Sequence, residues 1–401
     1  TCLESGTGCD VLAIPHNTNW SNGQMFHVEY PGTTSIDEER EAARLRAAIE
    51  PLIEIYQHKG DSECTNGLTS ILGGEDELCN FEKLKTSFAD CGDEPGFGMI
   101  IGLGCVSRMD FVRYVLTEGL REQTRLGENP YKLGIIASTD THNGTPGLVR
   151  EADFPGHVGI EDDTSEDQLA PIELIPGGIL NSPGGLAGVW AEENSRDAIF
   201  EALRRRETFG TSGPRITARF FGGWSFDDTL CADANLVARG YADGVPMGGD
   251  LPPRPDGAGS PTFLTSALRD AGTELYPGGK LERIQIIKGW IDDEGIPNQA
   301  VYEVVTSSDT EGEVNLNTCA AAPGGEDSLC GHWSDPDFDP LRPAVYYVRV
   351  LERPSCRFSW RQCLSLPEAE RPPTCSATSI PKTIHERAWT SPIWYNPTPA
   401  S

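Results

Sequence analysis

The sequence predicts an α/β part over residues 1–215, followed by a β-rich, sandwich-like domain over residues 216–401. Two observations predict the first part: apolar runs that end in polar residues, and amphipathic stretches between those runs. Alternating strands and helices are typical of a parallel βα barrel or an open α/β sheet. In both architectures the functional groups gather where the strands end. A third observation, short β-branched segments after about residue 215, predicts the second domain.

Three apolar runs are interpreted as strands, and a histidine follows each of them. The runs are residues 11–14 before His16, residues 52–55 before His58, and residues 133–137 before His142. The chain has seven histidines, so three at such ends favour one shared site over three unrelated polar loops. Glu54 lies inside the second run, where a carboxylate is costly to bury unless it is paired or bound to a cation.

Asp140 and His142 form the clearest pair of candidate ligands. They follow the third run and lie two residues apart, so on extended backbone their side chains project to the same side. A carboxylate and an imidazole presented together suit a divalent metal ion. The alternative is an ordinary polar loop, and the recurrence of the pattern upstream argues against it.

Three stretches between and after these runs predict helices, at residues 39–50, 107–120 and 194–206. The first is rich in Ala, Leu, Arg and Glu, follows a capping-box sequence at residues 35–38, and ends at Pro51. The other two carry apolar residues at helical spacing along one face. The first part therefore has the strand and helix alternation that a parallel sheet requires.

The second domain is predicted from segments that are short, β-branched or aromatic, and bounded by Gly, Pro and Asp. These segments are residues 216–221, 283–288, 301–305 and 345–350. Residues 60–98 contain three cysteines and several glycines, and they are interpreted as an irregular insertion in the first part.

Composition excludes several classes of partner. The 401 residues include 32 basic and 61 acidic side chains, for a formal net charge of −29. Such a charge argues against nucleic acid or an anionic membrane as a partner. The chain has no apolar run of about 18 residues, the length that a membrane span needs.

The twelve cysteines indicate disulfides. They occur in even number, mostly in loop-like sequence, and none forms a C-x-x-C pair of the kind typical of structural zinc or thioredoxin-type chemistry. We therefore expect an oxidising compartment, periplasmic or extracellular. The expected local pairs are Cys2 with Cys9, Cys319 with Cys330, and Cys356 with Cys363 or Cys375.

Several long motifs, taken together, resemble one family. They include His16-Asn-Thr-Asn-Trp-Ser-Asn-Gly23 and Ser138-Thr-Asp-Thr-His-Asn143. Further motifs lie at residues 58–64, 76–82, 191–196, 206–215, 244–250, 286–290 and 386–395. The chain is similar to the DUF3604 family, exported relatives of the PHP (polymerase and histidinol phosphatase) metal-dependent phosphoesterases, over nearly all its length. The resemblance implies the C-terminal portion of a PHP-type distorted βα barrel, followed by the β-rich domain packed on it.

The resemblance also implies an activity. The barrel would hold two or three divalent ions (zinc, manganese or iron) that activate water to hydrolyse a phosphate ester or a related anion. Asp140 and His142 match the closing Asp-x-His metal motif of the superfamily, and His16 matches an earlier histidine ligand. Glu54 lies where such barrels place an acidic residue near the site.

Other residues are assigned as candidate catalytic and substrate-binding groups. His58 is a catalytic candidate and His157 a substrate-binding one; for both, the alternative is a loop histidine bonded to backbone. Arg215 follows a turn at the start of the β-rich domain and is the candidate side chain for binding the anion; the alternative is a surface arginine that pairs an acid. Asn17 and Lys59 lie beside candidate ligands and are expected to contact substrate.

One departure from the superfamily affects the expected partners. PHP proteins open with a His-x-His motif on their first strand, and this chain contains no such motif. We therefore expect the N-terminal ligands to come from a missing or separate segment, with an associated N-terminal fragment of the same protein as partner. The expected substrate is a small anionic ester.

Two alternatives to a phosphoesterase remain at the level of sequence. The same ions could hydrolyse a sulfate or phosphonate ester, because substrate choice depends on pocket shape. The chain could instead be a non-catalytic exported protein that binds metal or a partner, with Trp224, Trp290 and Trp394 stacking on sugars rather than packing in the core.

Overall fold

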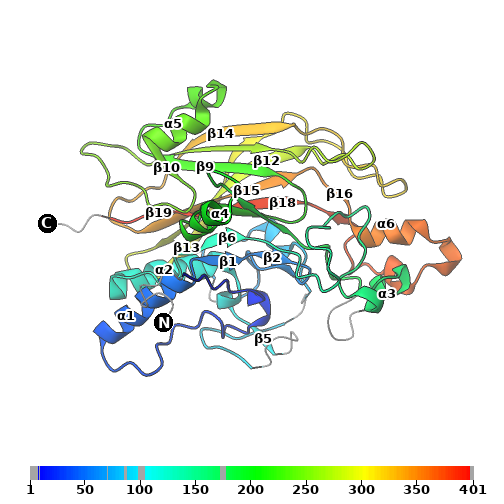
Figure 1. The fold of residues 1–401 in the computed structure, drawn as a ribbon, viewed down its shortest axis with the longest axis horizontal. Helices are drawn as coiled ribbons and strands as arrows, with labels where there is room; N and C mark the ends of the chain where they lie inside the picture. Colours follow the sequence, from blue (N-terminus) through cyan, green and yellow to red (C-terminus); the bar gives the residue numbers. More distant parts are fainter. Residues whose placement is uncertain are drawn as a thin grey trace.

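Three layers build the protein: a four-stranded sheet, a seven-stranded sheet, and a layer of helices with a small parallel sheet (Figure 1). The structure is a computed structural model. It describes residues 8, 10–69, 71–84, 88–97, 104–171 and 178–397.

The α-helices of the described residues range from 4 residues in α3 to 15 in α2. The α-helices are α1 (Ile36–Ile49), α2 (Val112–Leu126), α3 (Ser165–Gln168), α4 (Arg196–Arg204), α5 (Leu236–Asp243) and α6 (Phe358–Ser365). The 3-10 helices are η1 (Thr18–Trp20), η2 (Glu77–Asn80), η3 (Arg108–Asp110), η4 (Gly159–Glu161), η5 (Asp228–Ala232), η6 (Glu368–Glu370) and η7 (Pro373–Ser376).

The two large sheets are antiparallel. In spatial order the first contains β10 (Gly244–Pro246), β9 (Thr217–Gly223), β11 (Thr262–Leu268) and β14 (Ser328–Ser334). The second contains β13 (Pro297–Thr306), β12 (Leu281–Ile291), β15 (Ala344–Glu352), β18 (Arg387–Thr390), β8 (Thr208–Thr211) and β7 (Leu186–Val189), and β19 (Ile393–Tyr395) also pairs with β15.

Smaller sheets complete the strands. β1 (Leu52–Glu54) pairs in parallel with β6 (Gly134–Ile136), and β4 (Ala89–Asp90) in parallel with β5 (Cys105–Val106). β2 (Tyr56–Gln57) pairs with β3 (Gly60–Asp61), and β16 (Ser355–Cys356) with β17 (Thr383–Ile384), both antiparallel. The described strands close no barrel, so the expected barrel is not confirmed.

The α/β prediction is otherwise confirmed at the level of elements. α1, α2 and α4 overlap the three predicted helices, and β1 and β6 overlap the second and third predicted strands. The Oγ of Ser35 accepts from the Glu38 N–H and caps α1, whereas the capping box at residues 107–110 belongs to η3. Residues 11–14 form no strand, and their Ala13 N–H donates instead to the carbonyl at the end of α1.

The two large sheets pack face to face as a sandwich. One apolar core joins Phe220 and Phe263 of the four-stranded sheet to Ile286, Tyr346 and Val348 of the seven-stranded sheet. β7 and β8 come before residue 215 in the chain, yet they belong to the larger sheet and pair with β18. The larger sheet therefore includes strands from both sides of the predicted boundary.

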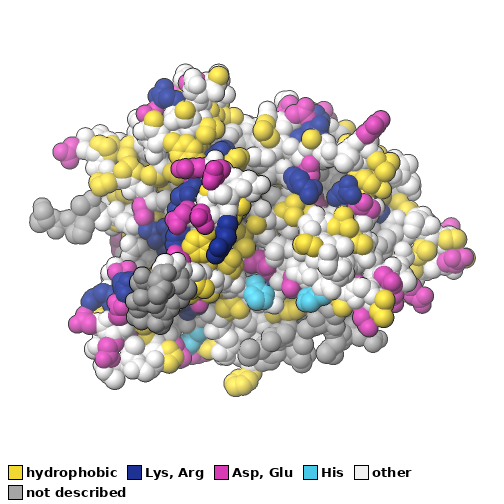
Figure 2. All heavy atoms as spheres, in the orientation of Figure 1, with side chains coloured by type: hydrophobic (Ala, Val, Ile, Leu, Met, Phe, Trp, Pro, Cys, Tyr) yellow, Lys and Arg dark blue, Asp and Glu magenta, His cyan; other side chains and the backbone are white. Residues whose placement is uncertain are grey.

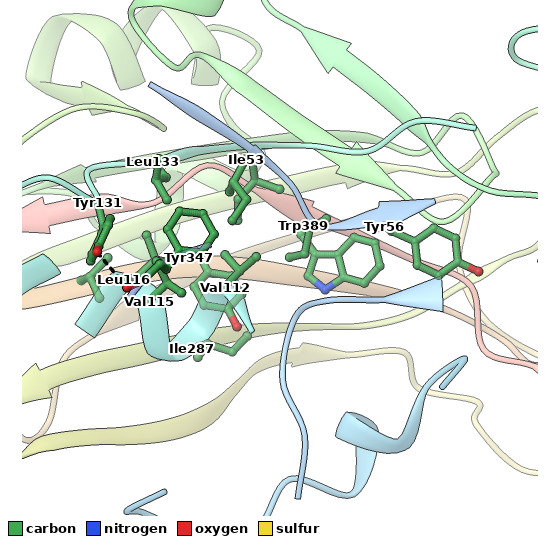
Figure 3. Packing of buried hydrophobic residues seen from close by; sticks show 14 of the residues in the cluster. Ile53, Tyr56, Val112, Val115, Leu116, Tyr131, Leu133, Ile287, Tyr347 and Trp389 are labelled. Carbon is green, nitrogen blue, oxygen red and sulfur yellow. Dashed lines mark hydrogen bonds between the residues drawn. The ribbon is translucent and has the colours of Figure 1, made fainter. Parts of the chain in front are cut away.

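A second core lies on the opposite face of the larger sheet. Here α2, through residues such as Val112 and Leu116, packs between β1 and β6 on one side and Ile287 and Tyr347 on the other (Figure 3). Burying an aliphatic or aromatic side chain of this size contributes about 1.5–3 kcal/mol each. α2 and the larger sheet pack against β1 and β6, which pair with no other strand among those described.

A buried ion cluster joins these layers. The carboxylate of Glu63 accepts from Arg113 (2.7 Å), the Tyr347 hydroxyl (2.8 Å), Arg349 (3.1 Å) and the Trp389 indole (2.7 Å). Burial acts to raise the pKa of Glu63, but the neighbouring guanidinium groups hold it well below its usual range. Both Arg113 and Arg349 also bind Asp76, so every charge in the cluster is paired.

The described disulfides correct the expected pairing. They join Cys64 to Cys79, Cys91 to Cys105, Cys231 to Cys330, Cys319 to Cys356, and Cys363 to Cys375. The predicted pairs Cys319–Cys330 and Cys356 with Cys363 or Cys375 are wrong. β14 pairs with β11 and carries Cys330 to the cluster beneath η5, where Cys231 lies. Cys2 and Cys9 lie outside the described residues.

The disulfides fit the expected oxidising compartment. No helix in the described ranges is long and apolar enough to cross a membrane.

Replacing Glu63 by Gln should lower the free energy of unfolding by about 3–5 kcal/mol, because it leaves Arg113 and Arg349 with one carboxylate between them. Urea denaturation followed by circular dichroism measures this change. The control is Glu41→Gln, which breaks an exposed pair with Arg44 and should leave the midpoint unchanged. Equal effects from both variants would contradict the role given to the cluster.

Stability should fall with rising pH because of Glu352. Glu352 is 4% exposed, and burial, followed by the charge of Asp270, raises its pKa to about 8. The folded protein therefore keeps a proton that the unfolded chain releases above about pH 4.5. Stability from this group is complete below that pH and is lost as the pH rises towards 8.

The test compares wild type with Glu352→Gln, which stays neutral. Between pH 5 and pH 9 wild type should lose on the order of 4 kcal/mol more unfolding free energy than the variant. Glu201→Gln, at an exposed position of α4, should keep the wild-type slope. Parallel curves for wild type and the Glu352 variant would refute the assignment.

Candidate active site

The parallel pairing of β1 and β6 brings the two main site segments together. Glu54 lies opposite Ile136, an offset of 82 residues. The ladder continues beyond both strands, because the Ser138 N–H donates to the Tyr56 carbonyl (3.0 Å). The same offset relates His58 to Asp140, and the His58 Nε2 lies 3.2 Å from an Asp140 carboxylate oxygen. The polar groups meet at the carboxyl ends of the strands, as the sequence predicts.

Asp140 is the centre of this group. Its backbone is left-handed (φ 54°), a conformation that Asp tolerates better than most residues, and the turn presents its carboxylate to His58 and His142. The His142 Nε2 lies 4.0 Å from the second carboxylate oxygen, and the His142 ring is 58% exposed. Burial acts to raise the pKa of Asp140, but His58, His142 and His16 together lower it. Asp140 is therefore an anion facing three imidazoles.

His157 joins the group through His58. The two rings lie with centroids 4.4 Å apart, and both are buried. The His157 Nε2 lies 2.7 Å from the Ser182 carbonyl, which can only accept, so this nitrogen carries the proton. Its Nδ1 is then a bare lone pair, and it has no hydrogen-bond partner among the described residues. Burial, followed by the neighbouring His58, lowers the pKa of His157 to about 3, so the ring is neutral at physiological pH.

Glu54 is held by hydrogen bonds at the edge of the group. Its carboxylate accepts from Gln57 Nε2 (2.8 Å) and from the Ser138 hydroxyl. The same Gln57 nitrogen donates to the Asn17 side chain (2.8 Å). Gln57 therefore links β1 to the loop that carries His16 and Asn17, and the buried Glu54 has the partners that its burial requires.

Lys59 directly follows His58 in the chain. Its side chain is fully buried and donates to the Ser62 hydroxyl (2.9 Å). Burial lowers the pKa of Lys59 to about 8, although Glu54, Asp61 and Asp140 each act to raise it. The buried ammonium therefore supplies positive potential near Asp140. It offers no exposed contact for a substrate.

The structure brings most of the predicted site residues together. His58, Asp140, His142 and His157 form one group, and Glu54 and Asn17 join it through Gln57. His16 is exposed and acts on Asp140 through its charge. Arg215 is exposed, and its backbone N–H donates to Asp270 (2.8 Å). Within the described part of the chain, no contact connects Arg215 to the histidines.

Three residues of the site were not predicted. Gln57 and Ser138 flank predicted residues, so their position at the two strand ends was an available signal. Ser182 bonds both histidine segments, but nothing in its Asn-Ser-Pro-Gly sequence indicates this. Figure 2 shows histidine side chains reaching the surface on the face in view, beside acidic and apolar groups.

The side chains of His58, Asp140, His142 and His157 are of the types that bind a divalent ion. Part of their geometry also fits one. Two ligands of one zinc ion, each bound at about 2.0–2.1 Å, lie roughly 3.3 Å apart, and His58 and Asp140 show 3.2 Å. The bare Nδ1 of His157 is a further donor whose other nitrogen is fixed by a carbonyl, as metal-binding histidines require. Of the described groups, only Cys64, Asp76 and Cys79 place three donor atoms within 4.8 Å of one another. That trio cannot bind metal, because its cysteines form a disulfide and Asp76 binds two arginines.

Comparison with known protein families gives a match. The model of a family described as "Protein of unknown function (DUF3604)" matches residues 1–397. The chain belongs to the DUF3604 family. No curated protein matches it. The match covers both large sheets and the whole histidine group of this DUF3604 protein.

In this DUF3604 protein, Gln57→Leu should free the loop around His16. The variant removes the donor shared by Glu54 and Asn17, which costs about 1–3 kcal/mol for a buried carboxylate. Hydrogen exchange measured by mass spectrometry should then be faster at residues 15–22. The control is Gln24→Leu, which removes an exposed hydrogen bond to Gly96 in the same loop. Unchanged exchange in the Gln57 variant would show that this side chain does not hold the loop.

Proposed function

We propose that this DUF3604 protein is an exported, metal-dependent hydrolase of a phosphate ester or a related anionic ester. The observation that carries the proposal is the convergence of Asp140 with His58 and His142 at the ends of two parallel strands. An anionic carboxylate among imidazoles is the donor set that zinc, manganese or iron prefers. The resemblance of the motifs to PHP phosphoesterases supports the same chemistry and a barrel-related origin for β1 and β6.

The residues that would hold an ion are Asp140, His58, His142 and His157. A bound divalent ion would supply Lewis acidity to water and would neutralise charge on the ester. Asp140 is anionic and His157 is neutral at physiological pH, so neither must lose a proton first. A cluster of two or three ions needs more donors than these four and His16, and we propose that another associated segment supplies them.

The remaining polar residues would adjust the electrostatic potential of the site and supply an oriented carboxylate. Lys59 offsets part of the negative potential of a chain that carries a net charge of −29, which otherwise repels an anionic ester. Glu54 is fixed by two donors and is available as an oriented carboxylate beside the strand ends. The disulfides support a periplasmic or extracellular location.

A sulfate or phosphonate ester would use the same groups, and the substrate class is decided by screening. A non-catalytic metal-binding protein is the second candidate. The observation that favours it is the small number of described donors, which is enough for one ion and short of a cluster.

The test is metal binding and hydrolysis by Asp140→Ala. Isothermal titration with Zn²⁺ and with Mn²⁺ should show affinity lowered at least 100-fold, and hydrolysis of nitrophenyl phosphate, phosphonate and sulfate esters should be lost. Asp153→Ala is the matched control, because Asp153 is as exposed as Asp140 (32% against 30%) but pairs with Arg150. Wild type that binds neither ion would refute the proposal. Metal binding without hydrolysis of any ester would favour the second candidate.

A further inference from the structure

We infer that Arg357, about 200 residues distant from the site in sequence, is the positioning residue that sets the His58 and His157 pair through Ser182. The inference rests on the proposed function only in giving that pair a role in metal binding. The positioning itself rests on hydrogen bonds that cross three segments of the chain.

Ser182 is the point that the two histidine segments share. Its carbonyl accepts from the His157 ring (2.7 Å), and its N–H donates to the His58 carbonyl (2.9 Å). Its hydroxyl donates to the Gln57 carbonyl (3.3 Å), and the residue is fully buried. A shift of the Ser182 backbone would therefore move the His157 ring and the His58 backbone together.

Arg357 holds the three residues that precede Ser182. Its guanidinium donates to the carbonyls of Ile179 (2.6 Å), Leu180 (3.1 Å) and Asn181 (2.5 Å). These carbonyls belong to a turn, so no regular ladder satisfies them, and a buried carbonyl without a donor is costly. The turn that leads into Ser182 therefore depends on the Arg357 side chain for its hydrogen bonds.

Arg357 is itself fixed from the opposite side. Its Nε and Nη2 donate to both carboxylate oxygens of Glu82 (2.8–3.0 Å), and its Nη1 donates to the Ser359 hydroxyl (2.9 Å). The adjacent Cys356 is tied to Cys319 by a disulfide. α6 follows directly and lies beside α3 at one end of the molecule (Figure 1). Arg357 is therefore held in place by Glu82, Ser359 and the neighbouring disulfide. In turn, it holds the backbone before Ser182.

Only arginine can make this set of bonds. A guanidinium has five N–H donors in one plane, whereas a lysine ammonium has three donors on a single atom and cannot reach Glu82 and three carbonyls together. Arg357→Lys keeps the charge that Glu82 needs and removes the planar set. The variant therefore separates positioning from charge.

The chain offers a matched control in Arg353. This arginine is also buried, binds the Glu282 carboxylate (2.8 Å), and donates to the carbonyls of Pro323, Glu311 and Gly312. In the described residues, the loop that it holds makes no contact with His58 or His157. Arg353→Lys should cost comparable stability without changing the histidines.

The experiment records long-range ¹H–¹⁵N spectra of the histidine rings in metal-free protein, and then titrates Zn²⁺. In wild type, His157 should show a protonated Nε2 and a bare Nδ1. Arg357→Lys should lose that single tautomer and bind Zn²⁺ at least tenfold more weakly, as loss of an outer support to a metal ligand does. Arg353→Lys should match wild type in both measurements.

A second variant guards against misfolding. Glu82→Gln with Arg357→Gln removes both charges of the buried pair, and it should show the same loss at His157. Ring spectra of the Arg357 variants that match those of Arg353→Lys would overturn the inference. If wild type binds no Zn²⁺, the proposed function fails, while the spectra of the metal-free protein still decide the positioning role.

Discussion

A carboxylate removed from water must find donors that replace its hydration, and Glu63 finds them in three separate parts of the fold. Arg113 comes from α2, Tyr347 and Arg349 from β15, and Trp389 from β18. These elements are the helical layer and the centre of the seven-stranded sheet. Glu63 follows His58 by only five residues. The buried ion cluster that joins the layers therefore also fixes the strand end that carries His58.

Residues 60–98, predicted as an irregular insertion, have a structural role that their composition does not indicate. Among them, the acidic residues Glu63, Asp76 and Glu82 all bind arginines that lie far along the chain, at Arg349 and Arg357 among others. These ion pairs hold the segment together with a disulfide between Cys64 and Cys79 and a small apolar cluster that includes Leu68. Such pairs are worth less as net stabilisation than as a source of specificity, since any misplacement leaves a buried charge alone.

Local signals predicted much of the fold, and long-range pairing limited the rest. The helix at residues 36–49 and the strands β1 and β6 carry periodicity and caps in their own residues. The pairing of Cys319 with Cys356 depends on where β14 and β16 lie, which no local pattern encodes. The missing barrel has the same origin, because whether β1 and β6 find further neighbours depends on what covers them.

The candidate site likewise contains residues that local sequence predicts and residues that it does not. Asp140, His142 and His58 were predicted because polar residues at the ends of apolar runs meet wherever those runs pair. Arg215 was chosen from its place beside a turn, and its contacts lie with Asp270 instead. Ser182 and Arg357 could not be predicted, since each acts through backbone carbonyls and leaves no pattern of its own in the sequence.

The constant offset between β1 and β6 has a consequence for how this chain can vary in evolution. The meeting of His58 and Asp140 depends on counting residues within each strand segment, from Leu52 to His58 and from Gly134 to Asp140. One residue inserted or deleted inside either count would turn a donor to the opposite face. Between the Cys64–Cys79 and Cys91–Cys105 bridges, loop length does not enter the count at all. A change of one residue within either short count would therefore separate His58 from Asp140.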